Sequence, residues 1–198
     1  MVKCHSQRLK HNGLIICLND SFGTAVIPRT ASLEEELKGL PMSDKREMLR
    51  HFIASIAYHA TKAIQDAPSG YPEFNSGQEA RTPRQILHHM TGVLSYAHSF
   101  FEEYDTTYFE HKSWDAEKAH FYETLSRLDT SLKEKGPRDM SEEQLLQGPL
   151  SDTMAHIGQL LMLRRLVGSP VPSENFIFAD IRKGAVGSDQ PPPVAPDE

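Results

Sequence analysis

The chain has 198 residues and a formal net charge of −6, with 38% hydrophobic and 24% charged residues. This length and composition are ordinary for one globular domain. The acidic balance, without a cluster of lysines or arginines, argues against a nucleic-acid-binding protein, which usually presents a basic face. The two cysteines, Cys4 and Cys17, match neither a metal finger nor a disulfide framework, so we expect reduced thiols.

The first 20 residues carry basic side chains followed by the apolar run GLIICL. This run is shorter than the roughly 7–15 apolar residues of a signal peptide. No stretch of the sequence approaches the ~20 apolar residues of a membrane span. We therefore expect a cytoplasmic protein that has no membrane as a partner.

Residues 1–40 show no clear periodicity and are predicted to be an irregular N-terminal extension. Two helices then follow, over about residues 43–67 with Ser43 as N-cap, and over about 83–104 with Thr82 as N-cap and Pro83 at the first helical position. Apolar residues recur along both segments at helical spacing. Each helix therefore has one side suited to a core.

Two further long helices are predicted over about residues 113–135 and 150–167, and Gly168 suits the end of the last one. A short helical turn between them begins at Ser141, which forms a capping box with Gln144. Four long amphipathic helices without a confident strand predict an all-α four-helix bundle over residues 41–172. The connection between the second and third helices appears short in the sequence, which predicts antiparallel neighbours. Residues 173–198 are a C-terminal extension whose Pro-rich end we expect to be flexible.

Ligand-type side chains recur on the second and fourth helices. Asp152 and His156 are four residues apart, one helical turn, beside the apolar stripe of the fourth helix. On the second helix, His89 lies on the apolar side and His88 on the polar side. Two histidines and one carboxylate can bind Zn, Ni, Fe or Mn, and a set of three protein ligands is typical of catalytic sites. The sequence thus predicts a divalent metal held by His89, Asp152 and His156.

Two nearby side chains are candidates for positioning a ligand or substrate around that metal. They are Gln159, almost one turn beyond His156, and Tyr96 on the second helix. Glu117 and His120 form a Glu-x-x-His pair, but di-iron bundles use two such pairs, so that class is not favoured. Five other histidines are expected on solvated faces or helix ends: His51, His59, His88, His98 and His111.

The same residues allow a second interpretation without metal. His89 would be a core histidine bonded to the backbone, Asp152 would favour the positive end of its helix, and His156 would bond Asp152. The protein would then be a non-catalytic, dimeric helical bundle with a binding or structural role and a buried polar network. Stoichiometric metal in the purified protein distinguishes the two interpretations.

The segments TPRQILHHMTGVLSYA and GPLSDTMAHIGQLLMLRRLVGSPVP resemble the DinB/YfiT-like superfamily of four-helix bundles, over about residues 43–170. That family has one histidine on the second helix and His-x-x-x-His before Gly-Gln on the fourth. His89 matches the first histidine and His156 the last, whereas Asp152 stands where the family has the first histidine of the pair. The resemblance implies a left-handed up-down-down-up bundle, a divalent metal near one end and frequently a homodimer.

The resemblance also carries an expectation about activity. It implies a divalent-metal-dependent enzyme that acts on a small-molecule substrate. The implied reaction is that of a transferase or isomerase that uses a low-molecular-weight thiol as cofactor, or of a hydrolase. The substrate itself is not identified by any residue set in the sequence.

Overall fold

A computed structural model describes residues 44–77, 79–102 and 113–194. The chain divides between Gly39 and Leu40, and the fold below is that of the second unit. The expectations for residues 1–40, the predicted N-cap Ser43 and His111 lie outside the described residues. None of the described helices is long and apolar enough to cross a membrane.

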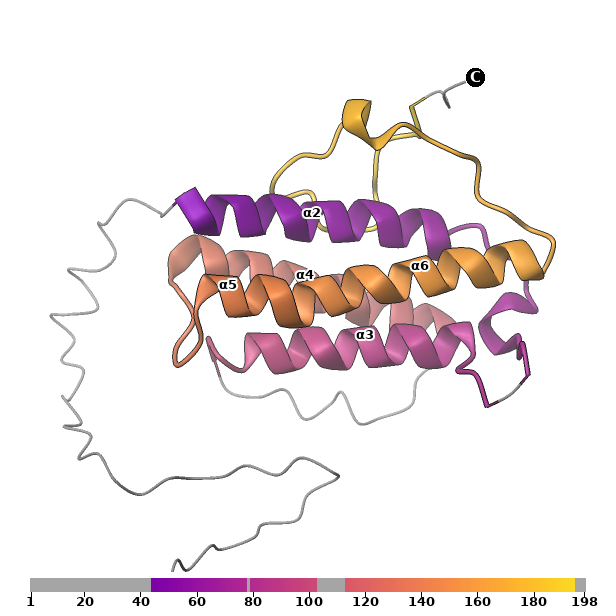
Figure 1. The fold of residues 1–198 in the computed structure, drawn as a ribbon, viewed down its shortest axis with the longest axis horizontal. Coiled ribbons are helices and arrows are strands. Elements are labelled where there is room, and N and C mark those ends of the chain that lie inside the picture. Colours follow the sequence, from indigo (N-terminus) through magenta and orange to yellow (C-terminus); the bar gives the residue numbers. More distant parts are fainter. Residues whose placement is uncertain (1–43, 78, 103–112, 195–198) are drawn as a thin grey trace, which may run out of the picture. The chain divides into compact units, whose positions relative to one another are not determined.

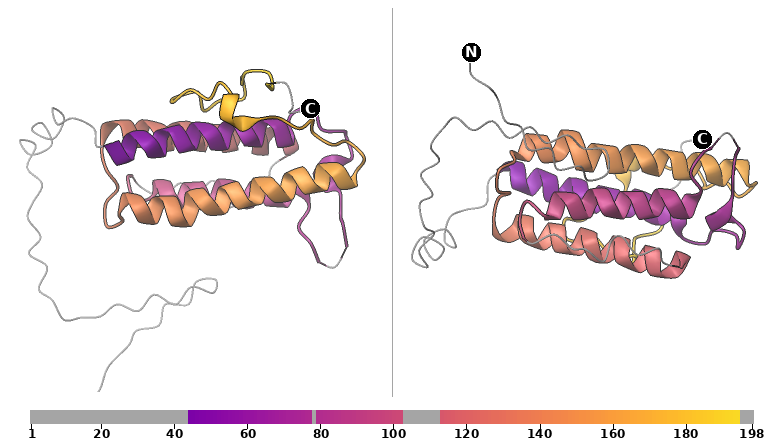
Figure 2. Two further views of the ribbon diagram at one scale, coloured as in Figure 1. Left: turned by 45° about the horizontal axis from the view of Figure 1, so that its top comes forward. Right: turned by 90° about the horizontal axis from the view of Figure 1, so that it is seen from below.

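The described part is helical and contains no strand. Four long helices lie side by side as a bundle (Figures 1 and 2). They are α2 (Asp44–Ile64), α3 (Pro83–His98), α4 (Trp114–Glu134) and α6 (Ser151–Leu166). The shorter elements are η1 (Tyr71–Glu73), α5 (Glu142–Leu145), the π-helical turn η3 (Leu146–Leu150) and η4 (Phe176–Phe178). The predicted helical bundle is therefore confirmed.

Local hydrogen bonds explain where α3 begins and where α6 ends. At the start of α3, the Thr82 side chain accepts a hydrogen bond from the Gln85 backbone, and the Gln85 side chain accepts one from the Thr82 backbone. At the end of α6, Gly168 adopts a positive φ of 74°. The backbone N–H of Ser169 then donates to the carbonyl of Arg164 at 3.0 Å. This closure needs a left-handed residue, which glycine provides at the least cost.

Contacts between the helices show their directions. His88 near the start of α3 contacts Glu117 near the start of α4, and His98 at the end of α3 bonds Ser131 near the end of α4. These two helices therefore run in the same direction. The expectation of antiparallel second and third helices is wrong. Their connection, residues 99–113, is long enough to span the 16-residue α3, because 15 extended residues reach about 50 Å and such a helix is about 24 Å long.

The other two helices run opposite to this pair. Arg50 near the start of α2 forms a bidentate ion pair with Asp129 near the end of α4. Arg164 near the end of α6 donates to the carbonyls of Ala63 and Gln65 at the end of α2. Consequently α2 and α6 are parallel to each other and antiparallel to α3 and α4.

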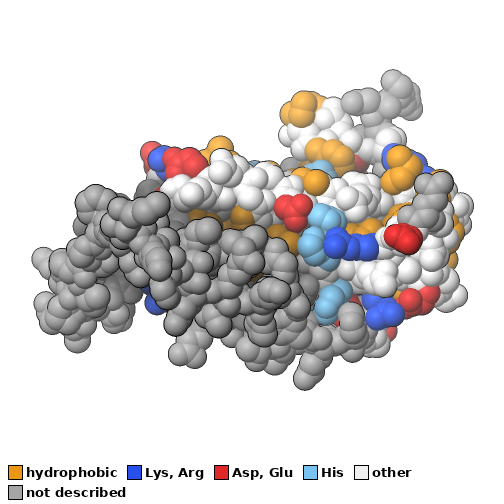
Figure 3. Space-filling view, turned by 60° about the horizontal axis from the view of Figure 1, so that its bottom comes forward, with side chains coloured by type: hydrophobic (Ala, Val, Ile, Leu, Met, Phe, Trp, Pro, Cys, Tyr) orange, Lys and Arg blue, Asp and Glu red, His pale blue; other side chains and the backbone are white. Residues whose placement is uncertain are grey.

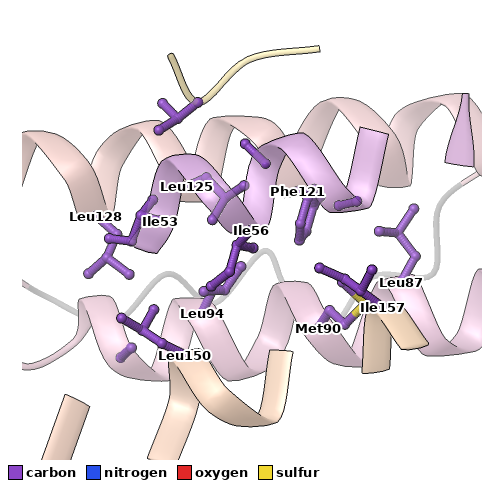
Figure 4. Packing of buried hydrophobic residues seen from close by; sticks show 14 of the residues in the cluster. Ile53, Ile56, Leu87, Met90, Leu94, Phe121, Leu125, Leu128, Leu150 and Ile157 are labelled. Atoms are coloured by element: carbon purple, nitrogen blue, oxygen red, sulfur yellow. The ribbon is translucent and has the colours of Figure 1, made fainter. Parts of the chain in front are cut away.

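The apolar sides of the helices meet along the centre of the bundle (Figure 4). Ile53 of α2, Leu94 of α3 and Leu125 of α4 have no exposed surface. Leu150 and Ile157 complete the core from the segment that leads into α6 and from α6 itself. Burying each such side chain stabilises the fold by roughly 1.5–3 kcal/mol.

The C-terminal extension returns along α2 (Figure 1). Val186 is buried and joins the core. The buried carboxylate of Glu174 accepts hydrogen bonds from the Tyr58 hydroxyl and from the backbone N–H of Val194, and it pairs with Lys62 at 2.9 Å. The start of the extension and its last described residue, Val194, are therefore attached at one carboxylate. The flexibility expected for the last residues stays a prediction.

Candidate metal centre

The three residues predicted as metal ligands converge between two neighbouring helices. His89 lies in the second turn of α3, and Asp152 and His156 lie in the first two turns of α6. Each offers one ligand atom, and these atoms all lie within 4.8 Å of one another. It is the only such group of three histidine, cysteine or acidic side chains among the residues that the structure describes.

The spacing of these side chains suits one small cation. His89 Nε2 lies 3.8 Å from Oδ2 of Asp152, and the His156 ring lies beside the same carboxylate, with its Nδ1, which is not the metal-binding atom, 3.5 Å from Oδ1. The two imidazole rings are 4.7 Å apart between centroids. Nitrogen and oxygen ligands bind zinc at about 2.0–2.2 Å, so ligands of one ion are about 3–3.5 Å apart. The three ligand atoms, which all lie within 4.8 Å of one another, approach that spacing.

His156 is held by its own helix. Its Nδ1 lies 2.8 Å from the backbone carbonyl of Asp152. Because a carbonyl only accepts hydrogen bonds, Nδ1 must donate, and Nε2 keeps the lone pair that a metal requires. The His156 side chain is also the most buried of the three, 10% exposed against 32% for His89 and 46% for Asp152.

Electrostatics favour the neutral form of His89. Burial lowers the pKa of His89, and the nearby charges of Arg81 and His156 lower it further, while Asp152 acts in the opposite direction. Neutral imidazole is the form that binds metals. Protons therefore compete less with a cation at His89 than at an ordinary histidine.

Asp152 is the most exposed of the three residues. Nearly half of its side chain contacts solvent. The high free energy of burying an unpaired carboxylate therefore does not apply to it. The case for a metal depends instead on the convergence of three ligand groups from two helices.

An open pocket of about 720 Å³ lies beside the triad. His89 and Asp152 form part of its lining, as does Tyr96, half of whose side chain is exposed. Gln159 is also exposed, but it is not among the residues that line this pocket. In Figure 3, histidine side chains reach the surface of the bundle next to acidic and basic side chains.

Sequence reasoning missed a wide turn that forms another part of the pocket. Gln147, Gly148 and Pro149 line it, and they belong to the π-helical turn η3, which joins α5 to α6 in one continuous helical run (Figure 1). Pro149 has no N–H to donate, and its ring clashes with the carbonyl four residues before it, so the turn widens. Ser151 then donates from its hydroxyl to the carbonyl of Leu146 at 2.7 Å, five residues back. A proline inside a helical pattern was the available signal.

Two histidines of α3 that were expected in solvent are not there, and His59 of α2 is partly buried, with its ring 4.1 Å from that of Phe176. His88 is largely buried, and its Nδ1 lies 3.0 Å from Oε1 of the fully buried Glu117. His98 is buried too, and its Nε2 lies 3.1 Å from the Ser131 hydroxyl. Both predictions were wrong, because this side of α3 faces α4. His88 and His98 link the two helices.

Comparisons with known proteins identify no relative of this chain. No protein-family model, curated protein or solved structure matches the chain. The function must therefore be argued from the triad, the pocket beside it and the chemistry of their side chains.

Proposed function

We propose that this protein is a divalent-metal-dependent enzyme of the DinB/YfiT-like type, with His89, Asp152 and His156 holding one ion. The observation that carries the proposal is the convergence of the three ligand atoms within 4.8 Å. The directions of the helices also support it, since α2 and α6 run one way and α3 and α4 the other, as in an up-down-down-up bundle. The left-handed arrangement and the family membership belong to the proposal.

Each ligand has a distinct role in such a site. A bound divalent cation supplies Lewis acidity and lowers the pKa of a coordinated water or thiol. His156 enters with its tautomer fixed by the bond from Nδ1 to the Asp152 carbonyl. Asp152 offsets part of the positive charge, and His89 binds from the facing helix. Three protein ligands leave further positions for substrate, and the pocket lies beside them.

The reaction class follows from the resemblance stated above. The proposed activity is that of a transferase or isomerase with a low-molecular-weight thiol as cofactor, or of a hydrolase, on a small-molecule substrate. Zn, Ni, Fe and Mn all suit a site of two histidines and one carboxylate. A homodimer in the cytoplasm is part of the same proposal.

A non-catalytic bundle is the competing function, and one observation favours it. Asp152 is half exposed and His156 already bonds the backbone, so neither needs a cation to be stable in the fold. In that case the triad is a polar network at the edge of a binding or structural protein.

Metal analysis separates the two functions. Untagged protein purified without added metal should contain about one ion per chain by plasma mass spectrometry. Asp152→Ala and His156→Ala should lose it, whereas His51→Ala, which removes an exposed histidine of α2, should keep it. Protein without metal, whose thermal stability is unchanged by Zn, Ni or Mn, would contradict the enzyme proposal and favour the non-catalytic function.

A further inference from the structure

The pocket beside the triad has walls of a particular chemistry. Apart from His89 and Asp152, the described residues that line it include Gly92, Val93 and Tyr96 on α3 and the turn around Pro149. None of these lining residues is a lysine or arginine. The walls away from the triad therefore offer no cationic side chain that would pair with an anionic group of a ligand.

The walls also leave apolar surface uncovered. Half of the Tyr96 side chain is exposed, and its ring packs edge to face against Phe100 with centroids 5.2 Å apart, which holds it in place. Gly148 also lines the pocket, and a Cβ there would meet no atom within 4 Å. The pocket is thus open at Gly148 and bounded by an aromatic ring at Tyr96.

We infer that this pocket takes the uncharged aromatic or aliphatic part of a small-molecule substrate, whose polar group reaches the metal. The inference rests on the proposed function for that polar group, whereas the apolar subsite stands on the wall residues alone. The volume of about 720 Å³ is in the range of small-molecule sites. A ligand ring placed there would cover exposed surface of Tyr96, Val93 and Pro149.

Two metal-binding probes of different size test the subsite in the zinc-loaded protein. Benzohydroxamate should bind about tenfold more tightly than acetohydroxamate, because its ring buries on the order of 60 Å² more apolar surface. Tyr96→Ala removes the aromatic wall, and Gly148→Leu fills the open space, so each should reduce the ratio to about twofold or less. Gly158→Leu is the matched control, since Gly158 is also helical, a Cβ there likewise meets no atom within 4 Å, and it does not line the pocket.

A second experiment uses metal-free protein, so it tests the apolar subsite independently of the metal proposal. Benzamide, but not acetamide, should shift the backbone amide NMR signals of Gly92 and Gly148 in metal-free protein. If zinc does not bind but benzamide shifts these signals, the metal proposal fails and the apolar subsite is supported. If zinc binds but the two hydroxamates bind equally and benzamide shifts neither signal, the apolar subsite is overturned and the metal proposal stands.

Discussion

Two adjacent histidines of α3 should respond in opposite ways to replacement by alanine. The His88 side chain is 15% exposed, and its Nδ1 lies 3.0 Å from a carboxylate oxygen of Glu117, which has no exposed surface. His89 is more exposed, and its Nε2 lies 3.8 Å from the carboxylate of Asp152, beyond hydrogen-bond distance. We expect His88→Ala to reduce stability and keep the metal, and His89→Ala to lose the metal with little change in the stability of the metal-free protein.

The structure sets the size of both effects. Removing a hydrogen-bond partner from a buried charged acceptor costs about 2–3 kcal/mol, and the space left by a largely buried ring adds about 1 kcal/mol. His88→Ala should therefore destabilise the protein by about 3–4 kcal/mol, or lower Tm by roughly 6–16 °C for a domain of about 150 residues. Among the described residues, none forms a hydrogen bond with the His89 ring, so the effect of His89→Ala should be below about 1 kcal/mol.

Urea denaturation of chelator-treated protein measures the stability, and plasma mass spectrometry on untreated protein measures the metal. His51→Ala serves as the common control, because it should change neither. If His88→Ala lost the metal while His89→Ala kept it, the assignment of the two sides of α3 would be wrong. If His88→Ala cost less than about 1 kcal/mol, the contact with Glu117 would not be a significant link between α3 and α4.

Three further predictions concern the rest of the bundle. Burial lowers the pKa of His59, so the unfolded state binds the proton more readily than the folded state. The free energy of unfolding therefore falls as pH drops below about 6.5. Urea denaturation at pH 7.5 and 5.5 should show a smaller loss of stability at the lower pH in His59→Gln than in the unmodified protein. Arg164→Met removes hydrogen bonds to carbonyls at the end of α2, so thermal denaturation should show a loss of stability of about 2–3 kcal/mol. Arg165 is exposed, and Arg165→Met should cost less than about 0.5 kcal/mol of stability. Glu174→Gln weakens the attachment of the C-terminal extension, so hydrogen exchange at the Val194 amide should become faster.

Local patterns in the sequence were sufficient for much of the bundle. The capping box at Thr82 and the glycine at 168 mark helix ends because they satisfy backbone groups within a few residues. The pairing of Asp152 with His156 was equally accessible, since residues four apart on a helix are neighbours in any fold. His89 was found because its side of α3 is apolar, which correctly indicated that it faces the bundle rather than open solvent.

The errors on α3 have a physical cause. A helical wheel identifies one apolar stripe, but α3 packs against both α4 and α6, so its buried surface is wider than that stripe. The side with His88 also carries Thr91 and Ser95, which are buried although they are polar. Thr91 donates from its hydroxyl to the carbonyl of Leu87 at 3.0 Å, so its polar group is satisfied within the helix. Polarity alone therefore could not distinguish this side from a solvated one.

The direction of α4 also could not be read from periodicity. An amphipathic helix presents the same apolar side whether it runs parallel or antiparallel to its neighbour. Only the length of the connection carries information about direction, and residues 99–113 are enough for a return along the whole of α3. Contacts between particular residues were needed to decide.

The wide turn before α6 explains why the candidate metal site lies at the edge of the bundle. In an unbroken α-helix at 100° per residue, Leu145 would lie about 20° from both Asp152 and His156, and about 140° from Leu150. In the structure Leu145 and Leu150 both have no exposed surface, whereas the Asp152 side chain is 46% exposed. The π-helical turn around Pro149 contains one residue more than an α-helical turn, so Leu145 before Pro149 and Leu150 after it both reach the core. The acid and the histidine remain beside α3 at the border of the core, where both can meet His89 and the acid also meets the open pocket.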